Sequence, residues 1–295
     1  MLLPTGDARF AARLAEAHRL RDALPSGGAA AAALEAAGLL SEAPLPDDEE
    51  WADAVAVLRK SLLNALTPLP GPLERLHEHC CTDGTAFSPA RADHAAVMAA
   101  KKGVLAPLAN PARAQGFAAS YDAFIIGHVA PYVASCMPGC TELHYATLPT
   151  LRVATPSAAV ASIRPHADGI YDLPPGSLNF WLPLTEVCEA SALWVESAPG
   201  RADYHPLMRA TRFDGRACVH FTLPNSSPRT RVSLDFRCVP GTLFDRGGRG
   251  RLSRLGYWST AAATPSRNGA WEKRATGRVS KLHGLPHTAP PVEIR

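Results

Sequence analysis

Residues 230–238 read Thr-Arg-Val-Ser-Leu-Asp-Phe-Arg-Cys, and polar and apolar side chains alternate strictly through the run. Alternation with a period of two predicts a β-strand with two different faces. The apolar face consists of Val232, Leu234, Phe236 and Cys238, and the polar face of Arg231, Ser233, Asp235 and Arg237. Taken alone, the run fits a half-exposed strand with a solvated polar face. It equally fits a barrel strand whose polar face lines a site.

Metal-ligand residues upstream favour the second interpretation. His166 and Asp168 are separated by one residue, so on an extended strand they point to the same side. His220 follows 54 residues after His166, inside the β-like run 218–222. Two imidazoles and one carboxylate form the facial ligand set of iron(II) oxygenases, although zinc also binds these residue types. With such a site upstream, Arg231 is placed to grip a carboxylate, and Ser233 adds a hydroxyl donor.

This ordered set resembles the Fe(II)/2-oxoglutarate-dependent dioxygenase superfamily, nearest to its phytanoyl-CoA dioxygenase-like branch of small-molecule hydroxylases. The resemblance covers roughly residues 143–240. It is carried by HAD at 166–168, NFWLPLT at 179–185, SAPG at 197–200, His220 and TRVSLDFR at 230–237. The arginine eleven residues after the second histidine makes the set more specific than an isolated His-x-Asp.

The resemblance implies roles for individual residues. His166, Asp168 and His220 would bind Fe(2+), and Arg231 with Ser233 would bind the distal carboxylate of 2-oxoglutarate. Such enzymes release succinate and CO2 and use molecular oxygen to hydroxylate an unactivated C–H bond. Related halogenases replace the aspartate by a small residue, so the presence of Asp168 favours hydroxylation.

One segment departs from the family pattern. Relatives carry Gly-Ser-His after the part matching 197–200, whereas this chain reads Pro199-Gly200-Arg201-Ala202-Asp203-Tyr204-His205. His205 is therefore a rival third ligand. We prefer His220 because it lies in a β-pattern and because Arg231 follows it at the family's spacing.

Further residues are expected around the pocket. Asn179 is expected to hydrogen-bond the co-substrate or a metal-binding histidine. Trp181, on the same face of its strand, is expected to pack in the core. Candidates for substrate contacts are Arg152, Arg164, Tyr145 and Tyr171, and for the two arginines a structural ion pair is the alternative.

The chain divides into three predicted regions: a mainly helical part over residues 1–142, the catalytic core over 143–240, and a partly irregular extension over 241–295. Short alternating runs between Pro and Gly turns predict an α+β fold with a double-stranded β-helix, or jelly-roll, core buttressed by N-terminal helices. Within the helical part, Asp47 and Glu50 suggest a capping box. Pro131 is expected to break the apolar segment 124–133.

Composition narrows the function. A net charge of +3 argues against nucleic acid, and no apolar run is long enough to span a membrane. Seven dispersed cysteines indicate free thiols in a reducing compartment, hence the cytoplasm, although an Ala- and Arg-rich N-terminus leaves organelle targeting open. HEHCC at 77–81 looks metal-binding but is interpreted as a helix end. The expected partner is a small polar metabolite of secondary metabolism, and the oligomeric state is open. Desaturation, cyclisation or epimerisation by the same chemistry, or a non-catalytic cupin-like sensor, are the alternatives.

Overall fold

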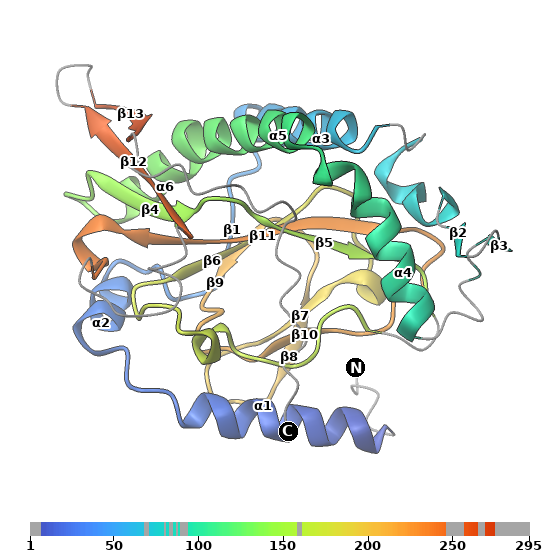
Figure 1. The fold of residues 1–295 in the computed structure, drawn as a ribbon. Coiled ribbons are helices and arrows are strands. Elements are labelled where there is room, and N and C mark those ends of the chain that lie inside the picture. Colours follow the sequence, from blue (N-terminus) through green and yellow to red (C-terminus); the bar gives the residue numbers. More distant parts are fainter. Residues whose placement is uncertain are drawn as a thin grey trace.

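Two β-sheets face each other between layers of helices (Figure 1). The computed structural model describes residues 7–67, 71–79, 81–82, 85–86, 88, 94–157, 161–245, 257–264 and 269–274. Helices α3 and α5 cover the outer face of the larger sheet, and α1 covers the outer face of the smaller one. The expected α+β class, with a sheet-rich core and N-terminal helices, is confirmed.

The larger sheet is built around β11 (Arg231–Pro240), which is buried along its whole length. It pairs antiparallel with β6 (Leu178–Pro183) on one side, and with β5 (Thr150–Ala154) and then β4 (Glu142–Ala146) on the other. The order is β1-β9-β6-β11-β4-β12-β13. The outer members are β1 (Ala43–Pro44), β9 (Thr211–Phe213), β12 (Trp258–Thr264) and β13 (Ala270–Lys273).

The smaller sheet has the order β10-β7-β8, from β7 (Leu193–Glu196), β8 (Tyr204–Leu207) and β10 (His220–Thr222). Helix α1 (Ala8–Asp22) packs on its outer face, where the Phe10 and Phe221 rings meet edge to face at 5.1 Å between centroids. Arg21 in α1 also donates to Glu196 at 2.8 Å. Helix α1 therefore covers the face of the smaller sheet that points away from the larger sheet.

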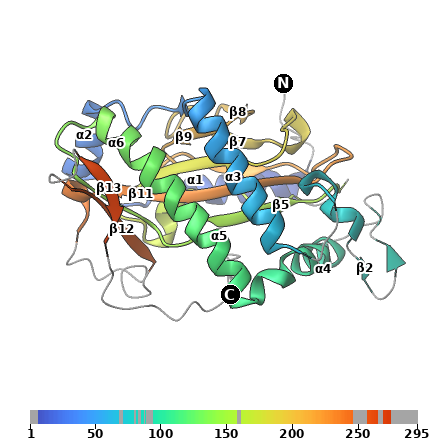
Figure 2. The ribbon, with the colours of Figure 1, turned by 90° about the horizontal axis from the view of Figure 1, so that it is seen from above.

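The main hydrophobic core lies between the larger sheet and the helices. Phe180 and Phe236 stack there at 5.2 Å, and Tyr121 and Phe124 of α5 (Pro111–Phe124) pack on Phe236. Figure 2 shows α5 lying beside α3 (Glu49–Ala65) over the sheet. The remaining described helices are α2 (Gly28–Ala36), the 3-10 turns η1 (Leu73–His79), η2 (Ala106–Ala109), η4 (Asp168–Tyr171), η5 (Glu189–Ser191) and η6 (Gly241–Leu243), and α4 (His94–Leu105). The short strand β2 (Cys81–Thr82) pairs antiparallel with β3 (Thr85–Ala86).

Two helix predictions are wrong in detail. The cap of α3 is Asp48 rather than Asp47: its carboxylate accepts a hydrogen bond from the Trp51 amide at 3.0 Å. Pro131 does not end the helical segment, because the π-helical turn η3 (Ile125–Val129) carries the chain into α6 (Ala130–Cys136). The amide of Ala130 bonds back to the Ile125 carbonyl, and this wider turn accommodates the ring that would clash in a regular helix.

The sheet extends beyond the predicted core boundaries. Strand β12 pairs with β4, β13 pairs with β12, and β1 near the N-terminus pairs with β9. Arg246 to Arg251, in the extension predicted over 241–295, lie outside the described residues. Among the described part of the chain, no helix is long and apolar enough to cross a membrane. Cys136, Cys140, Cys188, Cys218 and Cys238 are free, as expected.

Phe236 provides a test of the helix-facing core. Phe236→Ala should lower the free energy of unfolding by about 3–5 kcal/mol, because it removes a fully buried ring from a close-packed cluster. Chemical denaturation measures the loss. Val57→Ala, at a side chain 59% exposed, should change stability by less than about 0.5 kcal/mol. Equal effects of the two changes would contradict the placement of this core.

Candidate metal centre

Three side chains from two distant parts of the chain meet between the two sheets. His166 bridges to His220 at the start of β10, and each of the two residues donates its backbone N–H to the other's carbonyl. Asp168 begins the turn η4 directly after this bridge. One ligand atom from each of the three residues lies within 4.8 Å of the others, and this is the only such group among the described residues. The sequence-predicted triad is therefore assembled in space.

Hydrogen bonds set the orientation of both imidazoles. Nδ1 of His166 lies 2.7 Å from the Arg164 carbonyl oxygen, and Nδ1 of His220 lies 3.0 Å from that of Cys218. A carbonyl only accepts, so Nδ1 carries the proton in both rings and the Nε2 lone pairs are available. Those Nε2 atoms lie 3.3 and 3.8 Å from Oδ1 of Asp168. Two nitrogens and one oxygen thus converge on one point.

The second oxygen of Asp168 is already occupied. Oδ2 accepts from Nη2 and Nε of Arg237 at 2.6 and 3.0 Å, and from the Asn179 amide at 2.5 Å. Burial alone would raise the pKa of Asp168, but the charge of the Arg237 guanidinium holds that pKa well below its usual range. The carboxylate is therefore ionised, with only Oδ1 directed at the histidines.

His220 is held neutral. Burial lowers its pKa to about 4, and the neighbouring His166 adds to the decrease. A neutral imidazole is the form that binds a metal ion. Asn179, expected to contact the co-substrate or a metal-binding histidine, donates to the Asp168 carboxylate instead.

The polar face of β11 is buried, so the alternative of a solvated strand is wrong. Arg231 and Ser233 have no exposed surface, and Asp235 and Arg237 are 6% and 7% exposed. Arg231 donates from Nη1 to the Ser233 hydroxyl at 2.7 Å and from Nε to the Ser191 carbonyl at 3.0 Å. Burial, together with the charge of Arg152, lowers the pKa of Arg231 to about 10.

Buried polar atoms without hydrogen-bond partners cluster on this inward face. Within the described structure they include Arg231 Nη2, Arg152 Nε, Asp235 Oδ1, Asn179 Oδ1 and Trp181 Nε1. Buried polar groups are normally satisfied, so such a concentration marks a volume that a polar ligand would occupy. Trp181 packs in the core as expected, and its ring also lies beside Arg231, with the guanidinium 5.9 Å from the ring centroid.

The other residues predicted to contact the substrate lie at different distances from the triad. Arg152 faces the site and donates to Asp235 at 3.0 Å. Tyr171, 39% exposed, packs its ring against His166 at 5.6 Å, so it lies at the mouth. Arg164 is exposed to solvent, and its positive charge acts on the Tyr171 hydroxyl. Lys101 of α4 was missed: burial and the charges of Arg152 and Arg231 lower its pKa to about 8.

Tyr145 does not line the pocket. It is fully buried on the helix side of the larger sheet, where its hydroxyl donates to Asp122 at 2.7 Å. The prediction failed because alternation along β4 does not reveal which face meets the site. His77, in the HEHCC segment 77–81, also has a structural role. It lies in η1, and its Nδ1 is 2.8 Å from the Thr230 hydroxyl.

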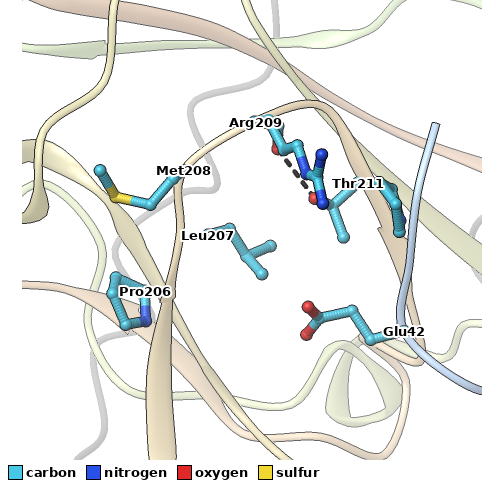
Figure 3. A pocket seen from close by; sticks show the side chains of 7 residues that line it. Glu42, Pro206, Leu207, Met208, Arg209 and Thr211 are labelled. Carbon is cyan, nitrogen blue, oxygen red and sulfur yellow. Dashed lines mark hydrogen bonds between the residues drawn. The ribbon is translucent and has the colours of Figure 1, made fainter. Parts of the chain in front are cut away.

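His205 belongs to a different region. It lies on the edge strand β8, separated from His220 by β7, and its Nε2 is 2.7 Å from Glu42 Oε2. Glu42 and Met208 line a separate pocket of about 330 Å³ over β8 and β9 (Figure 3). Since the His205 ring contacts Glu42 on the edge of the smaller sheet, it is not a member of the triad.

Comparisons with known proteins give distant likenesses. No family model matches the chain. A streptomycin biosynthesis protein, StrG of Streptomyces griseus, is 34% identical over 120 residues, which are 38% of this chain and 58% of that protein. The chain thus spans little more than half the length of this relative.

Solved structures resemble the chain at low identity. They include AviO1 from Streptomyces viridochromogenes Tue57 (16% identity, TM-score 0.41, 73% of this chain and 96% of that one) and the non-heme monooxygenase ThoJ as a nickel complex (12%, TM-score 0.40, 72% and 77%). A third is the non-heme α-ketoglutarate-dependent epimerase SnoN from nogalamycin biosynthesis (16%, TM-score 0.35, 90% and 96%). All these TM-scores are below 0.5, so the likenesses carry no argument about the chemistry of this chain.

Gly215 supports Asp168 from the loop before β10. Its carbonyl accepts from the Asp168 amide at 2.8 Å, and a Cβ at this position would overlap the Asn179 amide. Gly215→Ala should therefore lower the free energy of unfolding by about 1–3 kcal/mol, as overpacking does. Thermal and chemical denaturation measure it.

Gly116→Ala in α5 is the matched control, since nothing lies within 4 Å of the added methyl. It should leave stability unchanged or raise it by up to about 1 kcal/mol, because alanine favours a helix. A Gly215→Ala protein as stable as this control would refute the tight packing around Asn179.

Proposed function

We propose that the protein is an Fe(II)- and 2-oxoglutarate-dependent oxygenase that hydroxylates a small polar metabolite. The observation that carries the proposal is the His166–Asp168–His220 group on the same inward layer as Arg231, whose Nη2 is buried and unpartnered. A metal site alone fits many functions. A metal site on the same inward layer as the buried Arg231 and Ser233 fits a keto acid bound to the metal.

The donor set fits a ferrous ion. Two neutral imidazole nitrogens and one carboxylate oxygen on one side leave the other side for ligands, as in the facial triad of non-heme iron enzymes. Arg237 and Asn179 hold Oδ2 of Asp168, so Oδ1 alone is presented. Hydrogen bonds of this kind around a metal site fix its ligands and tune their basicity.

Arg231 and Ser233, which form the proposed carboxylate clamp, fit 2-oxoglutarate. The guanidinium of Arg231 has a free donor, and Ser233 adds a hydroxyl beside it. Carboxylate–guanidinium pairs are strong when both partners are removed from water. Iron with 2-oxoglutarate and oxygen supplies the oxidising power for an unactivated C–H bond, while the protein positions that bond and excludes water. The presence of Asp168 leaves no ligand position for a halide in its place, which supports hydroxylation.

The metabolite is proposed to be a small molecule of a biosynthetic pathway. The name of the StrG relative supports this class of substrate. The enclosed site also suits a small molecule better than a macromolecule, since every residue of the clamp is buried.

Anaerobic titration of the purified chain with Fe(II) and then 2-oxoglutarate tests the co-substrate. A weak absorption band at about 500–530 nm is expected for the chelate. Arg231→Ala should weaken 2-oxoglutarate binding at least tenfold without changing iron affinity, because it removes the clamp and spares the triad. Iron binding with no response to the keto acid would favour a cupin-like metal-binding protein and reject the oxygenase.

A paired histidine experiment tests the ligands. His220→Ala should abolish stoichiometric Fe(II) binding, measured by calorimetry under anaerobic conditions. His205→Ala should bind iron like the unaltered protein, because that ring contacts Glu42 on the edge strand. Iron loss in His205→Ala, with retention in His220→Ala, would overturn the ligand assignment.

A further inference from the structure

The inner layer of the site contains more positive than negative charge. Its cations are Arg152, Arg231 and Arg237, and its carboxylates are Asp168 and Asp235. Asp235 is shared, because Arg152 and Arg237 donate to the same oxygen at 3.0 and 3.2 Å. Among these five groups, one positive charge remains in surplus.

The proposed co-substrates do not remove this surplus. A ferrous ion adds two positive charges and 2-oxoglutarate adds two negative ones, so together they leave the balance unchanged. Metal-bound histidines are neutral and contribute nothing. Charges held away from water without a counterion are strongly unfavourable. A loaded site would therefore still favour a further anion.

Arg152 lies on the route to that anion. Its side chain is 13% exposed, whereas Arg231 is fully buried, so Arg152 is nearer the mouth marked by Tyr171. Nη2 of Arg152 is used by Asp235, but Nε is buried without a partner. Arg231, deeper in the chamber, remains for the keto acid.

Lys101 approaches the same region from α4. Burial lowers the pKa of Lys101 to about 8, and the charges of Arg152 and Arg231 lower it further. Cations repel one another, and an anion bound beside Arg152 would relieve that repulsion. Lys102, the next residue on the helix, is exposed to solvent.

We infer, on the basis of the proposed function, that the substrate carries an anionic group that binds Arg152 and Lys101. An anionic group balances the surplus positive charge, and a phosphate monoester supplies such a group, with oxygens suited to a guanidinium and an ammonium. The substrate class is thus a small phosphorylated metabolite rather than a neutral one. Recognition at this point would place the anionic end near the mouth and the remainder toward the metal.

Calorimetric titration with glycerol 3-phosphate tests the inference. The full chain is first loaded anaerobically with Fe(II) and 2-oxoglutarate, and the absorption band is checked in the same sample. Glycerol 3-phosphate should bind measurably and glycerol should not. Arg152→Gln should weaken binding at least tenfold and Lys101→Gln several-fold, while Lys102→Gln should have no effect.

Arg152→Lys guards against loss of folding, because it retains the charge next to Asp235. It should recover part of the affinity, and circular dichroism should show every variant folded. The inference is overturned if the phosphate ester does not bind, if it binds Arg152→Gln equally well, or if it only competes with 2-oxoglutarate. Absence of the absorption band before any ester is added would instead reject the oxygenase itself.

Discussion

The buried ion pair between Arg237 and Asp168 determines the geometry of the site. It joins the centre of the larger sheet to the turn that follows the backbone bridge between His166 and His220. Removing one partner of such a pair typically costs about 3–5 kcal/mol, since the other charge is left buried. The pair also divides the carboxylate into a held oxygen and a presented oxygen. Without it, Asp168 could rotate, and the convergence of three donor atoms would be lost.

Strand β11 makes this arrangement possible because it is buried on both faces with opposite chemistry. Its apolar side chains stack against the helices, where Phe236 contacts Phe180 and α5. Its polar side chains face the other way and pair with one another, with Arg152 of β5 and with Asp168. One strand therefore contributes both to the main core and to the chamber, and the period of two keeps the functions apart.

Much of this could be predicted from the order of residues. Strict alternation in 230–238 predicted the strand, and His166, Asp168, His220 and Arg231 predicted the triad and the clamp. Arg237 was visible on the same polar face, but its partner was not, because pairing depends on how the turn after His166 folds back. Lys101 could not be found, since a lysine in an Ala-rich helix carries no sign of the distant strand it approaches. The strand over 258–264 was missed because its alanines lack a contrast between faces.

Buried arginines of this chain differ in how fully their donors are used. Arg21 is paired with Glu196, and Arg212 donates to carbonyls of Leu39 and Ser41. Between the sheets, Arg231 and Arg152 each retain a buried donor without a partner. Local violations of this kind are tolerated where the surrounding packing is sufficient, and they concentrate at functional sites. The apolar cluster on the opposite side of β11 supplies that packing, so the same strand that carries the unsatisfied charges also holds them in place.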